Sequence, residues 1–501
     1  MRRRDFFRCA LGTAGALVLP RGLLAASGAA VWGDYPGLAK PFQLSPATRA
    51  KKVLEIYIMG GVSPWESFYC VPDPAYGKVG GTLWWTFQQG KDSIPAWHAA
   101  CSGSKQPLTE AWVKDSLGTT VHLGPHLAAL RARKDLVDRM RVFVQKHTME
   151  SHELAVPMAL TGHAPGAAGG FAVGAAVQRQ ALAAAGGGLS MPASYVLLPR
   201  SGGHFPGETA WATGRLPVAS RPVAVRIDQG KQFLATLARD NVGAHAPVLD
   251  SLAALYAKQG ASRLTPPGAT GAVRSLAFGD HQYAAGALSQ APKLAALFKA
   301  SQFDVPTLSV CGAPAAVLPV ATQLKLAVRL LQHPTSGTRH VTVLDEGVPG
   351  SEAGWDSHLD HAKWASINSD ALYTRVVALI NKPGEKDPDK LDLDETMIVI
   401  NTEFGRAPGT QAVTGRNHWP YGYTTALIGG PIGTKQAGLV GAIDAKGLAV
   451  GGITQTHERA AVLAAMGIWP FAPELFAVGG FPAGSEAAAA KWLKETVLGV
   501  S

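Results

Sequence analysis

Short apolar runs recur along the chain and are separated by longer, helical patterns. The runs are rich in β-branched residues and apolar on both faces, which is typical of buried parallel strands rather than half-exposed antiparallel ones. The predicted strands are residues 53–59, 142–145, 195–198, 307–310, 341–344, 397–401 and 424–428. The predicted helices are residues 123–139, 171–185, 229–258, 276–300, 315–332, 357–382 and 456–466.

This alternation predicts an α/β fold with a mostly parallel central sheet and helices on both faces. Gly- and Pro-rich stretches such as 162–170 and 265–271 look like loops within one architecture, so residues 31–501 are expected to form a single domain. In an open α/β sheet, ligands bind beyond the carboxyl ends of the strands. The chemistry is therefore expected at the strand exits.

The first thirty residues predict an export signal. Arg3 and Arg4 open a charged region, an uncharged stretch follows up to Pro20, and small residues end near Ala30. This is the pattern of a twin-arginine signal peptide, which implies the twin-arginine translocase as a partner and a periplasmic or secreted location. The alternative is a membrane anchor, but the apolar stretch is shorter than the ~20 residues needed to span a bilayer. We expect no stable membrane span after cleavage.

Charge and cysteine content narrow the choice of partners. The formal net charge is +10, and removing the signal leaves about +6, spread diffusely. No Lys/Arg block interleaved with aromatics is present, so nucleic acid is not an expected partner, whereas an anionic small molecule or polysaccharide is compatible with the charge. Cys70, Cys101 and Cys311 lack zinc-ligand spacing. The sequence favours a disulfide between Cys70 and Cys101, which are close in the chain, with Cys311 a buried thiol.

Two strand exits in the first half of the chain carry candidate residues. After residue 59, a Gly-Gly turn leads to Ser63 and Glu66, which either face a ligand or form a capping box on a helix that begins at Pro64. After residue 145, Ser151 and His152 follow, where the serine is a candidate activated hydroxyl and the histidine a candidate metal ligand. A solvated loop is the alternative for this second segment.

Two exits in the second half are richer in ligand-type residues. Asp356, His358 and His361 open the helix predicted at 357–382, where a helix cap explains Asp356 but not two histidines three apart. The exit after residue 401 provides Glu403 and Arg406, whose alternative role is a buried salt bridge, and it leads on to Arg416, Asn417 and His418. Acidic and imidazole groups at the exits of one sheet predict a mononuclear or dinuclear metal centre.

These motifs, in this order behind a twin-arginine signal, resemble the bacterial domain-of-unknown-function family 1501, from about residue 51 to 468. The resemblance implies a distant relation to the alkaline phosphatase and sulfatase superfamily, hence an alkaline-phosphatase-like three-layer sandwich. It further implies Ser151 as nucleophile, supported by His152 and Arg406. The implied ligands of a divalent ion (Zn, Mn, Ca or Mg) are Asp356, His358, Glu403, Asn417 and His418. The candidate substrate contacts at the strand exits are Ser63, Glu66, His361 and Arg416.

Some positions depart from that pattern. Pro64 and Glu66 stand where many relatives have His and Asp, and Asn417 replaces the usual Asp, which removes a charge from a possible ligand. Phe404 stands where sulfatase-like enzymes have a further ligand. A site with fewer carboxylates holds a divalent cation less firmly.

The resulting hypothesis is an exported metal-dependent hydrolase of phosphate or sulfate esters, with an arginine holding the anionic group. The alternative is a non-catalytic exported binding or assembly protein that acts on envelope polysaccharide or on a partner protein. An oxidoreductase is disfavoured because the first strand is not followed by Gly-x-Gly-x-x-Gly, and the chain contains no Cys-x-x-Cys.

Overall fold

An eight-stranded mixed sheet forms the centre of the protein in the computed structural model. The structure describes residues 31–71, 78–79, 82–83, 96–102, 110–167, 170–185, 194–199, 221–238, 243–264, 291–349, 354–409 and 415–501. The strand order is β16 (Gly438–Val440), β6 (Met140–Gln145), β15 (Tyr423–Gly429), β12 (Thr396–Thr402), β1 (Lys52–Ile58), β11 (His340–Asp345), β7 (Tyr195–Leu198) and β8 (Val223–Ala224). Of these eight strands, only β15 runs against its neighbours, so the predicted mostly parallel sheet is confirmed.

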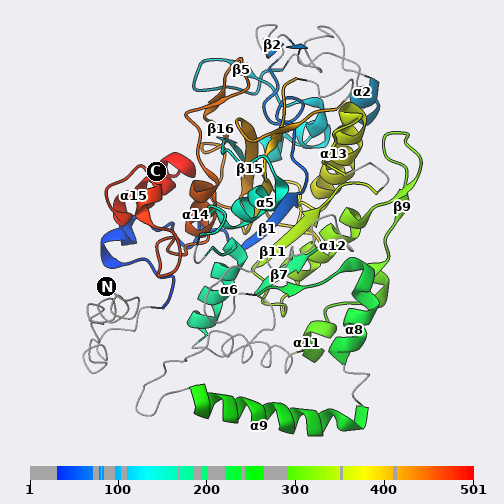
Figure 1. The fold of residues 1–501 in the computed structure, drawn as a ribbon, viewed down its shortest axis with the longest axis vertical. Helices are drawn as coiled ribbons and strands as arrows, with labels where there is room; N and C mark the ends of the chain where they lie inside the picture. The colour runs from blue at the N-terminus through cyan, green and yellow to red at the C-terminus, as the bar shows by residue number, and fades with distance from the viewer. Residues whose placement is uncertain are drawn as a thin grey trace, which may run out of the picture.

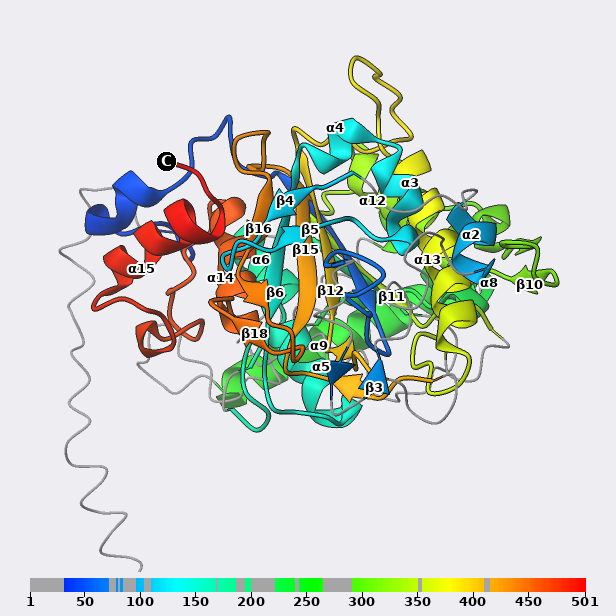
Figure 2. The same ribbon diagram turned by 90° about the horizontal axis from the view of Figure 1, so that it is seen from above.

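Helices cover both faces of this sheet, as Figure 2 shows end-on. One face carries α3 (Ala128–Arg131), α4 (Lys134–Val137), α8 (Gly230–Ala238), α11 (Ala291–Ala295), α12 (Pro319–Gln332) and α13 (His361–Ala378). The other carries α5 (His152–Thr161), α6 (Val173–Ala184), α14 (Gln455–Ala465) and α15 (Glu486–Trp492). The predicted α/β class, with helices on both sides of the sheet, is confirmed.

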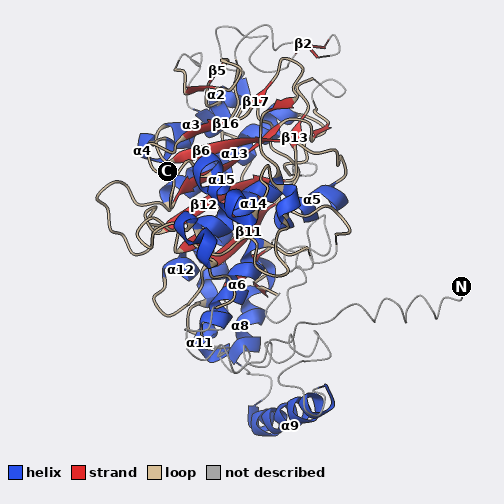
Figure 3. Ribbon diagram, turned by 90° about the vertical axis from the view of Figure 1, so that its left-hand side faces the viewer, coloured by secondary structure: helices blue, strands red, loops and turns tan. Residues whose placement is uncertain are grey.

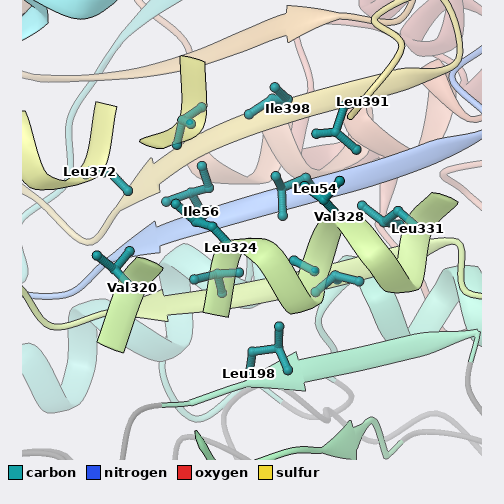
Figure 4. Packing of buried hydrophobic residues seen from close by; sticks show 14 of the residues in the cluster. Leu54, Ile56, Leu198, Val320, Leu324, Val328, Leu331, Leu372, Leu391 and Ile398 are labelled. Atoms are coloured by element: carbon teal, nitrogen blue, oxygen red, sulfur yellow. The ribbon is translucent and has the colours of Figure 1, made fainter. Parts of the chain in front are cut away.

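The central strand β1 shows why its sequence is apolar throughout. Leu54 and Ile56 face the α12 side and pack against Leu324 and Val328 (Figure 4). The alternate residues, such as Val53, face the opposite helices. Successive side chains of a strand point to opposite faces, and both faces are buried here, so apolar residues are required at nearly every position.

Several sequence-based boundaries need correction. Residues 307–310 are not a buried parallel strand: β9 (Thr307–Leu308) is exposed and pairs antiparallel with β10 (Ala316–Val317) outside the main sheet. The helix predicted at 123–139 is two short helices, α3 and α4, after a 3-10 turn at Pro125–Leu127. The helix predicted at 229–258 is α8 followed by α9 (Ala246–Leu264), which lies apart from the three layers (Figures 1 and 3).

Other sequence expectations meet the limits of the described residues. Most of the helix predicted at 276–300 and the whole signal at 1–30 lie outside them. Among the helices that are described, none is both long and apolar enough to cross a bilayer. A further helix, α5, was not predicted, since Pro157 within it is a residue that normally interrupts helices.

The disulfide differs from the predicted pair. Cys101, in α2 (Ala96–Ser102), is bonded to Cys311, and Cys70 is a free, fully buried thiol. Cys70 forms a β-bridge with His122 in the interior of the protein. Proximity in sequence was a poor guide because the fold brings two half-buried cysteines together across 210 residues.

Candidate metal centre

The carboxyl ends of the central strands bring together ligand-type side chains from distant parts of the chain. His152 is the first residue of α5, after β6; Asp356 and His358 follow β11; Glu403 follows β12. His418 begins β14 (His418–Trp419), which pairs with β13 (Gly405–Arg406) in a small hairpin. The expected clustering at the strand exits is therefore observed.

Imidazole groups converge on the carboxylate of Asp356. The Nε2 atoms of His358 and His418 each lie 3.0 Å from Asp356 Oδ1 and 3.1 Å from one another. The Nε2 atom of His152 lies 3.3 Å from Asp356 Oδ2. His152, Asp356 and His418 each offer a ligand atom, and these atoms lie within 4.8 Å of one another.

Two of these imidazoles are oriented by acceptors on their far side. His152 Nδ1 is 2.8 Å from Glu403 Oε1, and His418 Nδ1 is 2.6 Å from the main-chain carbonyl of Glu150. A neutral imidazole that donates its Nδ1–H to one of these oxygens would present its Nε2 lone pair to a cation bound within the group. This is the arrangement that commonly orients metal-bound histidines.

Glu403 is fully buried and makes several hydrogen bonds besides the one to His152. Its Oε1 accepts the Gly60 N–H at 2.6 Å, and its Oε2 accepts the Tyr57 hydroxyl at 3.1 Å. These partners satisfy a carboxylate that would otherwise be costly to bury. Glu403 therefore lies directly behind His152 rather than within the group of ligand atoms.

Charge in the group is balanced around Asp356. Burial alone would raise the pKa of this carboxyl, but hydrogen bonds from His152, His358 and His418 and the Arg406 charge lower it well below its usual value. Burial likewise lowers the pKa of His152, yet hydrogen bonds to Asp356 and Glu403 outweigh it and raise that pKa to about 9. Without a metal, positive charge on His152 and Arg406 stabilises the Asp356 carboxylate.

Arg406 is fully buried and paired with Asp356. Its guanidinium also donates to the carbonyls of Gly60 and, at 3.0 Å, of Arg416. The buried salt bridge considered from the sequence is thus present, although with Asp356 instead of Glu403. The guanidinium is fully buried and donates to these protein acceptors, so it faces the interior of the protein.

Close packing places the Asp356 segment against the turn after β1. Gly60 has φ +123°, and a Cβ there would lie 2.4 Å from the Asp356 backbone nitrogen. Only glycine permits this approach. On the other side, the Phe404 ring stacks on His418 at 4.4 Å between centroids and contacts His152 at 4.9 Å. Phe404, at the position where the resemblance implied a ligand, thus packs against two imidazoles.

Ser151 and Asn417, two further predicted site residues, are exposed at the edge of this group. Ser151 occupies the N-cap position of α5 and makes no side-chain capping hydrogen bond. Asn417 Oδ1 accepts the His418 N–H at 2.9 Å. Both lie one residue from a member of the group, but neither belongs to its convergent set of ligand atoms.

Ser63, Glu66, His361 and Arg416 lie together in a second cluster, which we call the buried network. Each is at most 3 % exposed. Arg416 donates to Glu66 Oε1 at 2.5 Å and to Ser63 Oγ at 3.1 Å, and Ser63 also bonds to Glu66. Because all four are buried, they do not face a substrate in this conformation, in contrast to the substrate contacts predicted from the sequence.

Both capping alternatives considered from the sequence are absent. A bend at Pro64 and a turn over residues 65–68 stand where the helix was predicted, so Ser63 and Glu66 cap no helix there. The helix predicted to begin at residue 357 begins at His361, after Asp360 in a left-handed conformation. Asp356 is therefore not a helix cap and is available to the histidines.

Some contributors could not be anticipated from the sequence. Tyr57 was assigned only to the core, yet its hydroxyl reaches Glu403. Glu150 contributes its carbonyl to His418, a role that any residue type could fill. An alternating strand pattern could have placed Tyr57 on the α5 face, but no residue pattern marks a carbonyl.

A sheet with a His/Asp group at its strand exits defines the class: an α/β protein with a candidate metal centre. The chain belongs to the DUF1501 family of proteins of unknown function, whose model matches residues 50–471. The predicted family is thus confirmed. No curated protein and no solved structure matches the chain.

Proposed function

We propose that this protein is an exported metal-dependent hydrolase of phosphate or sulfate esters. The observation that carries the proposal is the convergence of His152, His358 and His418 on Asp356. Imidazole nitrogens together with a carboxylate oxygen form a donor set that suits zinc, and other divalent ions of this kind compete for it.

The donor set fits a metal better than it fits an isolated hydrogen-bond cluster. His358 and His418 direct Nε2 atoms at each other, so at least one must be protonated to avoid opposing lone pairs. A cation among these atoms would satisfy both nitrogens and the Asp356 carboxylate together. When bound, such an ion would polarise an ester oxygen and lower the pKa of a bound water.

The residues around the group have distinct proposed roles. His152, Asp356, His358 and His418 hold the ion; Glu403 orients His152; Arg406 holds Asp356 in place. Asn417, exposed beside His418, remains a proposed peripheral ligand.

Ser151 is the proposed nucleophile. Its hydroxyl is exposed at the N-terminus of α5, where helix N–H groups favour an approaching anion. A phosphoryl or sulfuryl group bound there would lie beside His152, the next residue. Because Arg406 and Arg416 face protein acceptors, the ion and this helix end replace the arginines as proposed partners of the substrate anion.

A second candidate function follows from the Arg406–Asp356 ion pair. This pair already neutralises the carboxylate, so the cluster can persist without a metal. A non-catalytic exported protein that binds envelope polysaccharide or a partner protein is then the alternative. Export itself, through the signal at residues 1–30, remains a proposal from the sequence.

Metal analysis of the purified, exported protein tests the proposal. We expect at least one equivalent of bound divalent metal in the wild type, and a loss of most of it in His358→Ala and His418→Ala. His245→Ala, an exposed histidine next to α9, is the matched control and should retain the metal. Hydrolysis of 4-nitrophenyl phosphate or sulfate should fall together with the metal content.

Less than one equivalent in the wild type, unchanged by both site substitutions, would contradict the hydrolase and favour the binding protein. A metal-containing wild type in which Ser151→Ala hydrolyses these esters normally would instead exclude Ser151 as nucleophile, leaving a metal-bound water for that role.

A further inference from the structure

The proposed ligands reach the metal centre on segments that lie far apart in the sequence. Asp356 and His358 lie between β11 and α13, and His418 lies in the β13–β14 hairpin. The turn after β1 forms a third segment. Gly60 in this turn packs against the backbone of Asp356, and its carbonyl accepts a hydrogen bond from Arg406 in the hairpin. Something must fix these segments relative to one another if their donor atoms are to meet.

The buried network includes residues of all three segments. Ser63 and Glu66 come from the segment after β1, His361 from the beginning of α13, and Arg416 from the hairpin, two residues before His418. Glu66 and Arg416 form the central ion pair, and both are almost fully buried. His361 Nε2 lies 3.8 Å from Glu66 Oε2.

Further hydrogen bonds connect this network to the ligand segments. Ser357, next to Asp356, bonds to His361 Nδ1 at 2.7 Å. The Arg416 carbonyl accepts from Arg406, which itself holds Asp356. A Cβ at Gly415 would lie 1.4 Å from the His358 carbonyl, so the hairpin and the His358 segment are in direct backbone contact.

We infer that the Glu66–Arg416 ion pair is a positioning element of the metal centre: it fixes the His418 hairpin against the Asp356–His358 segment so that their donor atoms converge. This inference rests on the proposed function, because it assumes that the centre binds a metal. Neither residue is among the ligands; both act through the segments that carry them.

The chemistry of the pair suits this role. The guanidinium is a planar, rigid fork that engages the Glu66 carboxylate and the Ser63 hydroxyl at once, which fixes direction as well as distance. The charges have little access to water, so a neutral partner leaves an uncompensated buried charge. A small displacement of the hairpin would move His418 relative to Asp356, to which a metal site is sensitive.

Cobalt(II) is the probe for the test, because its visible spectrum reports the geometry of the ligands around it. In metal-free full-length protein, we expect Glu66→Gln to weaken cobalt binding by about 10- to 100-fold and to alter the spectrum of the bound ion. Arg416→Lys keeps the positive charge but loses the planar fork of the guanidinium, so its cobalt affinity should lie between those of Glu66→Gln and the wild type. Ser63→Ala removes one hydrogen bond and should have the smallest effect.

Glu55→Gln is the matched control. Glu55 is also almost fully buried and paired with an arginine, Arg459, but it makes no direct contact with the network or with the ligand atoms among the described residues. We expect it to lower stability while the cobalt affinity and spectrum remain those of the wild type. A general loss of packing would affect both variants alike.

The outcomes separate this inference from the proposed function. If the wild type binds no cobalt, the metal centre itself is contradicted. If the wild type binds cobalt and Glu66→Gln and Arg416→Lys bind it with unchanged affinity and spectrum, the positioning role alone is overturned. Should Glu66→Gln fail to fold, Arg416→Lys and Ser63→Ala decide, since a graded change in their spectra supports the role and wild-type spectra refute it.

Discussion

At the scale of single residues, the two oxygens of Glu403 explain why a carboxylate can be buried behind His152. One accepts N–H groups from Gly60 and His152, and the other accepts the Tyr57 hydroxyl. An acidic side chain at this position therefore serves to orient His152. Its proposed contribution to metal binding is indirect, through the tautomer of that histidine.

Glu403→Gln should weaken the affinity for zinc by about 10- to 100-fold. An amide oxygen accepts less strongly from His152 than a carboxylate does, and the amide NH₂ would face groups that themselves donate hydrogen bonds. Isothermal titration of metal-free protein measures this. Glu153→Gln, exposed on the same helix as His152, serves as the control and should bind zinc like the wild type. Wild-type affinity in Glu403→Gln would show that the carboxylate does not support His152.

Gly60→Ala should reduce metal content to well below one equivalent, since the new Cβ would lie 2.4 Å from the Asp356 nitrogen and displace that segment. The comparison is Gly384→Ala, which has a similarly positive φ of +83° but open space around the Cβ. Both substitutions strain the backbone, so a difference in metal content isolates the steric effect. Equal metal content in the two variants would refute this account.

At the scale of secondary-structure elements, the sheet was predictable because buried parallel strands require continuous apolar runs. Residues 53–59 and 397–401 indicated β1 and β12 for this reason. Residues 307–310 have similar composition, yet β9 is an exposed hairpin strand, because composition does not specify which strand pairs with which.

The candidate site was partly predictable at the same scale. Strand exits correctly indicated where Asp356, His358 and His418 would gather, since parallel strands end at one edge. Tertiary packing, in contrast, determines that α13 starts at His361. It also determines that Glu66 and Arg416 lie in the buried network, apart from the ligand atoms. No local pattern in the sequence encodes those contacts.

His340, the first residue of β11, provides a pH-dependent prediction. Burial lowers its folded-state pKa to about 4, below the value of about 6.5 expected for an unfolded chain. The unfolded state then binds a proton first as the pH falls, so stability is lost below about pH 6.5 and down to the folded pKa. Between pH 7 and 4.5 this costs about 2 kcal/mol.

Urea unfolding of the wild type and of His340→Gln at pH 7 and pH 4.5 checks this prediction. Carboxyl groups titrate in both proteins, so the difference between the two pH-dependent losses isolates the histidine. We expect the variant to lose less stability on acidification. An equal loss would mean that His340 takes up its proton as readily in the folded state as in the unfolded chain.

At the scale of the whole molecule, the Cys101–Cys311 disulfide joins α2 to the turn between β9 and β10. It closes a loop of 210 residues, and such cross-links stabilise by restricting the unfolded chain. Cys101→Ser and Cys311→Ser should each lower the free energy of unfolding by about 2–5 kcal/mol. Thermal unfolding followed by circular dichroism measures the change.

Reduction by dithiothreitol should lower the midpoint of unfolding of the wild type but not of either serine variant. The metal content should be the same in the oxidised wild type, Cys101→Ser and Cys311→Ser. Among the described residues, no contact joins this disulfide to the ligand atoms. A midpoint in the wild type that does not respond to reduction would argue against this bond.

The order of strands in the sheet also bears on biosynthesis. β1 is made early, but its neighbours β11 and β12 begin at residues 340 and 396, and His418 emerges later still. A growing chain thus holds its central strand without partners until most of the polypeptide has left the ribosome. Metal loading at the proposed centre would be among the last steps of maturation, and a chain that stops before β14 would lack His418 even if its earlier strands had formed.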